Sequence, residues 1–395
     1  MKFSRFCLSG LALALMAAGD AVAVDYLDGR LSVRGFGTLG TTYNATGDAE
    51  FIRDINQLDG PANSWSHDVD SRVGLQLGWR FNDKLDAVVQ GVSRYNHRGR
   101  YDPQLTWAFL RYAPDAGKQF RLGRVALDMY MLADSRDVGY SYLWVRPPVD
   151  YYGVRHITHI DGGDITLKRP LGPGLLWGKL YAGRADEKIS AGIDGVVLDA
   201  EGTRVYGGHI NYQWDAWHLQ LGSTELQYEF DASSEYMNSI RFAEFFDPAL
   251  ANVLKDIIEP VHMQMTSLGL AYDRGRFYVQ AMASHLNRPG DEFDVDSAFV
   301  TVGYRMEPFT PYVSLSGSRT EGVTYRELGL NFDGETGITQ QALSFGARYD
   351  FSRNLALKTQ LDFINVDQAG FLWRNIQPDW DGRTQVLSIN LDFVF

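Results

Sequence analysis

The chain has almost no cysteine. Its single cysteine, Cys7, lies within the first 23 of 395 residues, so a disulfide framework is excluded for the rest. Beyond this segment no stretch holds 18 consecutive apolar residues, which excludes membrane-spanning helices. Basic residues are also scarce, since 37 Lys and Arg stand against 49 Asp and Glu. Such an acidic chain is a poor partner for nucleic acid, whose phosphates require a basic surface.

The N-terminal segment has the features of an export signal. Lys2 and Arg5 precede an apolar run over 6–18, which ends in Ala21-Val22-Ala23. This predicts a secretory signal peptide over 1–23 and a mature chain of 24–395. The run is shorter than the ~20 residues that a membrane anchor needs. Removing residues 1–23 changes the net charge from −12 to −13, because Lys2, Arg5 and Asp20 leave together.

Alternation of apolar and polar residues dominates the mature chain. Sixteen segments show it: 31–43, 71–81, 85–95, 104–113, 119–127, 160–170, 175–184, 203–214, 217–228, 262–273, 276–286, 297–306, 309–318, 340–351, 355–366 and 385–395. A period of two is expected of strands that separate lipid from a wet lumen. Seven of the connections are short and have turn chemistry, and they alternate with long polar loops. The pattern predicts an all-β fold, a transmembrane antiparallel β-barrel of 16 strands.

A soluble sandwich or propeller is the alternative, because short strands with turn signals also describe those folds. The alternation of short and long connections and the export signal argue against it. Aromatic residues near the short turns support a membrane barrel, where they would form an interfacial girdle. They are Trp79, Phe81, Trp177, Trp214, Trp217, Phe309, Tyr349 and Phe351.

The last predicted strand has a further feature. Leu387, Ile389, Leu391 and Phe393 share one face, and the chain ends in Phe395. This ending resembles the signal that the barrel assembly machinery reads in the last strand of Gram-negative outer-membrane barrels. The resemblance implies that Phe395 is the assembly signal and that this machinery is a partner.

The connection over 128–159, after the fifth predicted strand, mixes both charges with many aromatic residues. Its charged residues are Asp128, Asp134, Arg136, Asp137, Arg146 and Asp150, and its aromatic residues include Tyr140, Tyr142, Trp144, Tyr151 and Tyr152. So many aromatic side chains predict that the segment packs against something. Sixteen strands enclose a lumen too wide for wall side chains to fill, so the lumen wall is the expected surface.

Two short motifs resemble those of a known family. Ser71-Arg72-Val73-Gly74-Leu75 and Leu122-Gly123-Arg124 look like segments of the sixteen-stranded trimeric general porins of Gram-negative bacteria. In that family the third extracellular loop follows strand five and folds inward to narrow the pore. The resemblance implies that 128–159 is the constriction loop. The chain lacks the Pro-Glu-Phe-Gly-Gly stretch of general porins, which indicates a divergent branch.

The resemblance also implies a basic cluster at the constriction, formed by Arg72, Arg94 and Arg124. Alternation independently places Arg72 inside, because Val73 and Leu75 would point to lipid. For 119–127 alternation leaves the direction open, and the inward assignment of Arg124 rests on the resemblance. Cations facing the loop acids would set a transverse field across a narrow aqueous throat. Arg348 and Lys358 are further basic candidates.

The implied function is passive diffusion of small hydrophilic solutes and ions through a homotrimer in the Gram-negative outer membrane, in contact with lipid and lipopolysaccharide. One alternative is a solute-specific porin with a site for an anion, a sugar or an aromatic acid. Another is a non-conducting structural barrel or adhesin. An enzyme is not expected, because no Gly-x-Ser-x-Gly elbow is present and the histidines are scattered. No metal or cofactor is expected either.

The connection over 229–260 is predicted to be a long extracellular loop with a short helix. Phe242, Phe246 and Leu250 recur at helical spacing. Asp247 would cap a helix whose first turn holds Pro248.

Overall fold

The computed structural model describes residues 24–153, 157–190, 197–228, 231–232, 234–246, 248, 251, 261–289, 294–321, 338–367 and 372–395. The predicted signal peptide over 1–23 lies outside the described residues.

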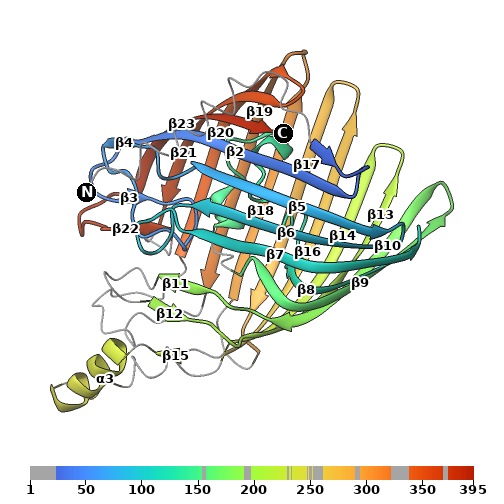
Figure 1. Cartoon of the computed structure of the whole chain (residues 1–395). Helices are drawn as coiled ribbons and strands as arrows, with labels where there is room; N and C mark the ends of the chain where they lie inside the picture. Colours follow the sequence, from blue (N-terminus) through green and yellow to red (C-terminus); the bar gives the residue numbers. More distant parts are fainter. Residues whose placement is uncertain are drawn as a thin grey trace.

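One closed antiparallel sheet makes up most of this part of the chain (Figure 1). Its sixteen long strands are β2 (Leu31–Asn44), β5 (Arg72–Asn82), β6 (Leu85–Arg94), β7 (Pro103–Asp115), β8 (Lys118–Ala126), β9 (His159–Leu171), β10 (Gly174–Arg184), β13 (Arg204–Trp214), β14 (Trp217–Tyr228), β16 (Val261–Arg274), β17 (Phe277–Asn287), β18 (Asp294–Tyr304), β19 (Phe309–Glu321), β20 (Ile338–Ser352), β21 (Leu355–Val366) and β23 (Arg383–Val394). Each pairs with the next along the chain, and β23 pairs with β2 to close the barrel. The predicted sixteen-stranded barrel is confirmed.

The seven short turns lie at one end of the barrel, and the long connections lie at the other. The β16–β17 turn needs Gly275, whose φ of +58° is in the left-handed region that favours glycine. Strand bounds agree closely with the alternation. The largest differences include the segment predicted at 297–306, which is β18 over Asp294–Tyr304.

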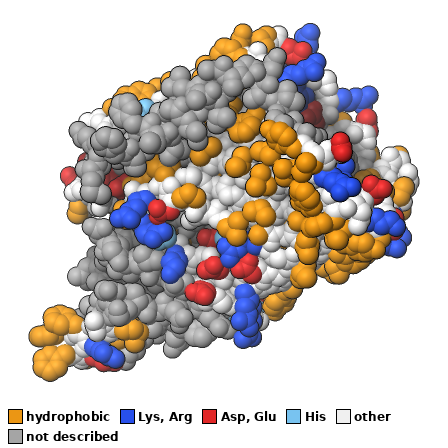
Figure 2. Space-filling view, viewed as in Figure 1, with side chains coloured by type: hydrophobic (Ala, Val, Ile, Leu, Met, Phe, Trp, Pro, Cys, Tyr) orange, Lys and Arg blue, Asp and Glu red, His pale blue; other side chains and the backbone are white. Residues whose placement is uncertain are grey.

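The two faces of the sheet have opposite chemistry. Leu122, Leu180 and Ile210 are 71%, 69% and 60% exposed on the outer face. Thr224 and Thr301, with the opposite alternation, are buried on the inner face. Figure 2 shows hydrophobic side chains spread over the outer wall. An apolar exterior and a polar interior are what a barrel in lipid requires. Among the described residues, no helix is long and apolar enough to cross a membrane.

Aromatic side chains gather on the outer wall near the short turns, as predicted. Trp79, Phe81 and Phe351 are exposed there. Trp214 stacks on Tyr212, with ring centroids 5.2 Å apart. The prediction is wrong for Trp177, which alternates with the outward Leu176 and Leu180 and lines an interior cavity. Closeness to a turn does not determine whether a side chain points outward or into the barrel.

Smaller elements supplement the barrel, and β3, β4, β11, β12, β15 and β22 lie at the end with the long connections (Figure 1). β3 (Glu50–Phe51) pairs with β22 (Trp373–Arg374). β4 (Ser64–Ser66) pairs with the last residues of β2, and β1 (Val24–Tyr26) pairs with its first residues, so both extend the main sheet. β11 (Lys188–Ser190), β12 (Val197–Asp199) and β15 (Asp231–Ala232) form a separate three-stranded sheet. η1 (Gly139–Ser141) and α2 (Val149–Tyr152) interrupt the connection after β8.

The connection over 229–260 contains the helix α3 (Ser234–Phe246), which projects away from the barrel in Figure 1. The predicted cap at Asp247 lies outside the described residues. Most of 247–260 lies outside the described residues. Phe242, Phe245 and Phe246 are exposed on α3, whereas Ile240 is buried.

The closing seam between β2 and β23 depends on two glycines. Gly35 N donates to Phe395 O at 2.8 Å, and Phe395 N donates to Gly35 O at 2.9 Å. The Phe395 ring occupies the place of a Cβ at Gly35, and the Phe393 ring does so at Gly37. Glycine therefore lets terminal aromatic rings lie flat across the neighbouring strand on the outer wall.

Replacing Gly37 with valine should destabilise the barrel by about 1–3 kcal/mol, because the new side chain overlaps the Phe393 ring. The measurement is the free energy of unfolding in urea, followed by tryptophan fluorescence. Gly178→Val is the matched control, since the nearest atom to a Cβ there is 3.6 Å away. Equal stability of the two variants would contradict the role of the seam.

Candidate pore and its lining segment

The segment 127–153 contacts the interior face of the barrel. Trp144 Nε1 donates to Thr301 Oγ1 at 2.8 Å. The backbone of Val145 completes the attachment, since its N donates to Gln360 Oε1 at 3.2 Å and its carbonyl accepts from Asn390 Nδ2 at 3.0 Å. Thr301, Gln360 and Asn390 all belong to the inward set of their strands. A polar inner wall thus supplies partners for an irregular backbone.

Aromatic rings form the hydrophobic part of this attachment. Tyr151 lies 4.9 Å from Tyr152 and 5.3 Å from Phe299 of β18, measured between ring centroids. Trp144 meets the same Phe299 ring edge-on at 5.6 Å. Tyr152 OH donates to Met131 O at 3.1 Å, which ties the two halves of the segment together. The aromatic residues are therefore a packed core.

Arg146 is a fully buried cation of the segment, with 1% of its surface exposed. Its Nη2 lies 2.5 Å from Asp70 Oδ2, and its Nη1 lies 3.4 Å from Asp362 of β21. It also donates to Thr42 Oγ1 of β2 at 3.0 Å. Burial alone would raise the pKa of Asp70, but the Arg146 guanidinium lowers it below the ordinary value. Two carboxylates on separate parts of the wall hold one cation.

Asp70 and Asp362 were not predicted as site residues, although alternation in the sequence contains a signal for both. Asp70 comes two residues before Arg72 and therefore shares its inward direction. Asp362 follows the same rule on β21, where Phe363 is exposed on the outer face.

Arg72 and Arg94 face the interior, where they contact the segment. They are direct neighbours across β5 and β6. Arg72 Nη2 donates to Tyr142 OH at 2.7 Å, and Arg94 Nη1 donates to Asp137 Oδ1 at 3.0 Å. Burial would raise the pKa of Asp137, but Arg94 and other nearby guanidinium groups lower it. These cations therefore fasten the segment to the wall.

Two further cations act on its backbone. Lys358 Nζ donates to Gly139 O at 2.6 Å and to Trp144 O at 2.9 Å, and it pairs with Asp392 at 2.9 Å. Arg348 Nη1 donates to Tyr140 O at 2.7 Å, and its guanidinium lies 4.5 Å from the centre of the Tyr140 ring. Backbone carbonyl oxygens of the segment that face the wall thus accept hydrogen bonds from charged side chains.

The other predicted acids have separate surroundings. Asp128 lies 2.5 Å from Lys179 Nζ and 3.1 Å from His209 Nε2. Asp150 accepts from Ser316 Oγ and from Gln340 Nε2, and burial raises its pKa. Asp134 is exposed within the barrel interior, and reduced hydration there, with the charge of Asp128, raises its pKa.

Arg136 donates to Tyr130 OH at 3.3 Å, within the segment. No group of three or more His, Cys, Asp or Glu side chains that could hold a metal ion occurs in the described ranges.

Arg124 does not join the basic cluster, so its inward assignment is wrong. It alternates with Arg121 and shares the outward face of Leu122, which is 71% exposed. It makes a bidentate pair with Asp161, directly opposite on β9, at 2.6 and 2.7 Å. A further contact joins it to Asp186 at 3.1 Å.

Arg121 takes the inward position on β8. Its Nη2 lies 2.6 Å from Asp164 of β9, and its guanidinium lies 5.1 Å from the centre of the Phe109 ring. The flanking apolar residues Phe120 and Leu122 agree with this direction, but Val125 and Leu127 have the opposite parity, so the sequence alone left it open.

A cavity of about 520 Å³ lies between the segment and the wall formed by β8, β9, β10, β13, β14, β16 and β17. Its wall residues include Gln119, Arg121, Thr166, Lys168, Trp177, Lys179, His209, Asn211, His218, Gln220, Tyr278 and Gln280. The segment contributes Asp128, Met131, Leu132, Asp134 and Ser141. Arg72 and Arg94 are not among the lining residues. The open space therefore adjoins a different wall from the one that the sequence suggested.

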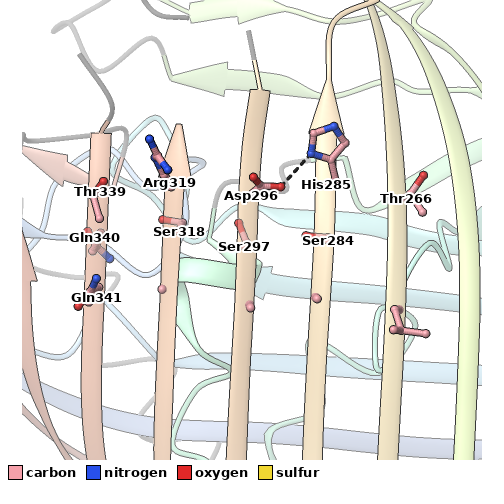
Figure 3. A pocket seen from close by; sticks show the side chains of 14 residues that line it. Thr266, Ser284, His285, Asp296, Ser297, Ser318, Arg319, Thr339, Gln340 and Gln341 are labelled. Carbon is pink, nitrogen blue, oxygen red and sulfur yellow. Dashed lines mark hydrogen bonds and ion pairs between the residues drawn. The ribbon is translucent and has the colours of Figure 1, made fainter. Parts of the chain in front are cut away.

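A second hollow, of about 540 Å³, lies over β16–β20 (Figure 3). Its floor includes Ala283, Ala298 and Gly317, which alternate in phase with the exposed Val300 and Leu315 and so face outward. His285 Nδ1 lies 2.8 Å from Asp296 Oδ1 at its edge. This hollow belongs to the outer wall and is separate from the interior cavity.

Comparison with known proteins shows similarity in structure alone. No family model matches the chain, and no curated protein matches its sequence. Among solved structures, it is similar to Salmonella typhi OmpF in complex with daunomycin, with a TM-score of 0.58 and 12% identity, covering 95% of this chain and 100% of that one.

The outer-membrane channel DcaP of Acinetobacter baumannii gives a TM-score of 0.56 at 11% identity, covering 95% of this chain and 100% of that one. The anion-selective porin of Comamonas acidovorans gives a TM-score of 0.53 at 14% identity, covering 92% of this chain and 100% of that one. The predicted resemblance to outer-membrane porins is confirmed as a likeness of fold, and the low identities fit a divergent branch.

Replacing Arg146 with methionine should destabilise the protein by about 3–5 kcal/mol, because it leaves buried carboxylates without their counter-ion. Unfolding in urea measures the loss. Arg305→Met is the control, since its pair with Asp273 is partly exposed and should contribute at most about 1 kcal/mol. A loss for Arg146→Met as small as that of the control would contradict the anchoring role.

Asp137 gives a pH prediction. Its pKa in the folded protein lies below the ordinary value of 3.8, so its stabilisation is present above that value and lost as pH falls through the folded pKa. The stability difference between wild type and Asp137→Asn should therefore stay constant from about pH 7 to 5 and shrink only in stronger acid. Urea unfolding at a series of pH values measures it. A difference that vanishes by pH 5 would contradict the pairing with Arg94.

Proposed function

We propose that this chain forms a water-filled channel for passive diffusion of small hydrophilic solutes and ions across the Gram-negative outer membrane. The observation that carries the proposal is a closed barrel with an apolar exterior and a polar interior cavity beside a tightly attached segment. Polar walls around a space of this kind lower the cost of moving a hydrated solute past lipid.

In this proposal the segment 127–153 narrows the passage. Arg72, Arg94, Lys358 and Arg146 hold it against one side of the barrel, which leaves the cavity on the opposite side as the route for solutes. The cations that would meet a passing solute are then Arg121, Lys168 and Lys179. This arrangement differs from the one expected from the sequence, in which a basic cluster faces the loop acids across the open throat.

Outer-membrane location, trimerisation and assembly partners belong to the same proposal. The apolar outer wall and the aromatic residues near the turns support contact with outer-membrane lipid and lipopolysaccharide. Phe395, held at the seam beside Gly35, is the proposed signal for the barrel assembly machinery. A homotrimer is proposed from the resemblance to general porins.

Planar-bilayer recording of the purified protein tests the function. Discrete openings that close in three equal steps would support a trimeric channel, and the reversal potential in a salt gradient would give its ion preference. A protein that folds and inserts, yet conducts nothing, would overturn the proposal in favour of a structural barrel or adhesin.

Ser141→Trp should lower unit conductance roughly twofold, because Ser141 lines the cavity and conduction depends on the free width there. The same change at Ser223, which lies on the outer face of β14, is the control and should leave conductance unchanged. Unchanged conductance in Ser141→Trp channels would place the passage elsewhere.

A further inference from the structure

Four interior side chains of the cavity lie in a single row across the strands. Lys168 on β9 lies directly opposite Trp177 on β10. Trp177 in turn lies opposite Asn211 on β13, and Asn211 lies opposite Gln220 on β14. Adjacent strands are about 4.8 Å apart, so Lys168 and Asn211 stand roughly 10 Å from each other. The row therefore presents an ammonium group, an indole ring and two amides in order.

The indole ring is held in position from one side. The His218 ring packs against Trp177 in a tilted arrangement with ring centroids 5.1 Å apart, and His218 Nε2 lies 2.9 Å from Asn211 Oδ1. Asn211 Nδ2 in turn lies 2.5 Å from His209 Nδ1. This chain of contacts orders the aromatic ring without using Lys168.

Two buried polar atoms beside the row have no hydrogen-bond partner in the described structure. They are Gln220 Oε1 and Thr166 Oγ1, and both residues line the cavity. Thr166 is two residues from Lys168 on the same face of β9. Gln220 and Thr166 are only 5% and 4% exposed. Buried polar groups are normally satisfied, so these atoms point to a hydrogen-bonding occupant of the cavity.

The charges around the row leave one cation available. Lys179 and His209 are engaged by Asp128, and Arg121 is engaged by Asp164. Lys168 makes no ion pair with any described residue. Asp134 is the remaining acid of the lining; its side chain is exposed to the cavity, where reduced hydration and the charge of Asp128 raise its pKa.

We propose that this row binds a small hydroxylated carboxylate of the sugar-acid class. The carboxylate pairs with Lys168, the ring lies on the Trp177 face, and hydroxyl groups bond to Thr166 and Gln220. The inference rests on the proposed channel function and makes the chain a solute-selective channel.

Each part of the row excludes a class of solute. Simple carboxylates lack a ring to lie on the indole, and neutral sugars lack the charge that pairs with an ammonium group. Aromatic acids would leave the buried oxygens of Thr166 and Gln220 unsatisfied, which costs free energy. A sugar acid meets all three requirements within roughly 10 Å.

Single-channel recording with galacturonate as the probe tests the inference. Galacturonate should produce saturable block, whereas galactose and acetate at equal concentration should produce little. Lys168→Gln should weaken the block roughly tenfold, because a charge-assisted hydrogen bond is lost. Trp177→Leu should weaken it as well, and galacturonate block should then approach that of acetate.

Lys84→Gln is the matched control, because this substitution removes the same charge from an exposed short turn outside the cavity. Heat resistance of each variant on a gel verifies that it is folded. Open channels with no galacturonate block, or block that survives Lys168→Gln, would overturn the site while leaving the channel function intact. Absence of any conductance would instead overturn the channel function itself.

Discussion

The structure depends on one constraint, that no strand edge is left open to lipid. Backbone N–H and C=O groups cannot remain unpaired in a hydrocarbon environment, so a spanning sheet must close on itself. Here closure joins β2 to β23 over Phe36–Asn44 and Val386–Val394. Gly35 and Gly37 make room for the rings of Phe395 and Phe393 at this seam. Once the seam closes, alternation assigns every side chain of the wall to lipid or to the interior.

Closure creates a second problem, because sixteen strands leave an interior that their own side chains cannot fill. The segment 127–153 occupies part of it through an aromatic core and a set of buried ion pairs. Arg146 joins carboxylates from Asp70 and β21, while Arg72, Arg94 and Lys358 fasten neighbouring parts of the segment. These charges are thus used to hold an irregular chain in place, and the cavity opens beside a separate set of cations on β8, β9 and β10.

Two corrections concern the face of the wall on which a residue lies. Arg124 was assigned inward from a short motif, because alternation left its direction open: Phe120 and Leu122 favour one parity, whereas Val125 and Leu127 favour the other. Trp177 was assigned to the interfacial girdle from its distance to a turn, although Lys179 and Tyr181 share its direction. For Trp177 the position near a turn was given more weight than the period of two, and for Arg124 only the paired strands of the barrel resolve which parity faces outward.

The amino-acid sequence was sufficient to predict the sixteen strands, their antiparallel order, the seven short turns and the inward direction of Arg72, because a barrel wall between lipid and water requires a strict alternation that can be read along the chain. It also indicated that the aromatic connection over 128–159 packs against something. The folded barrel was needed to see which wall receives that connection, that Asp70 and Asp362 share Arg146, and that Lys168, Trp177 and Gln220 line the open space. These relations join residues from distant strands, and their contacts exist only after the barrel has closed.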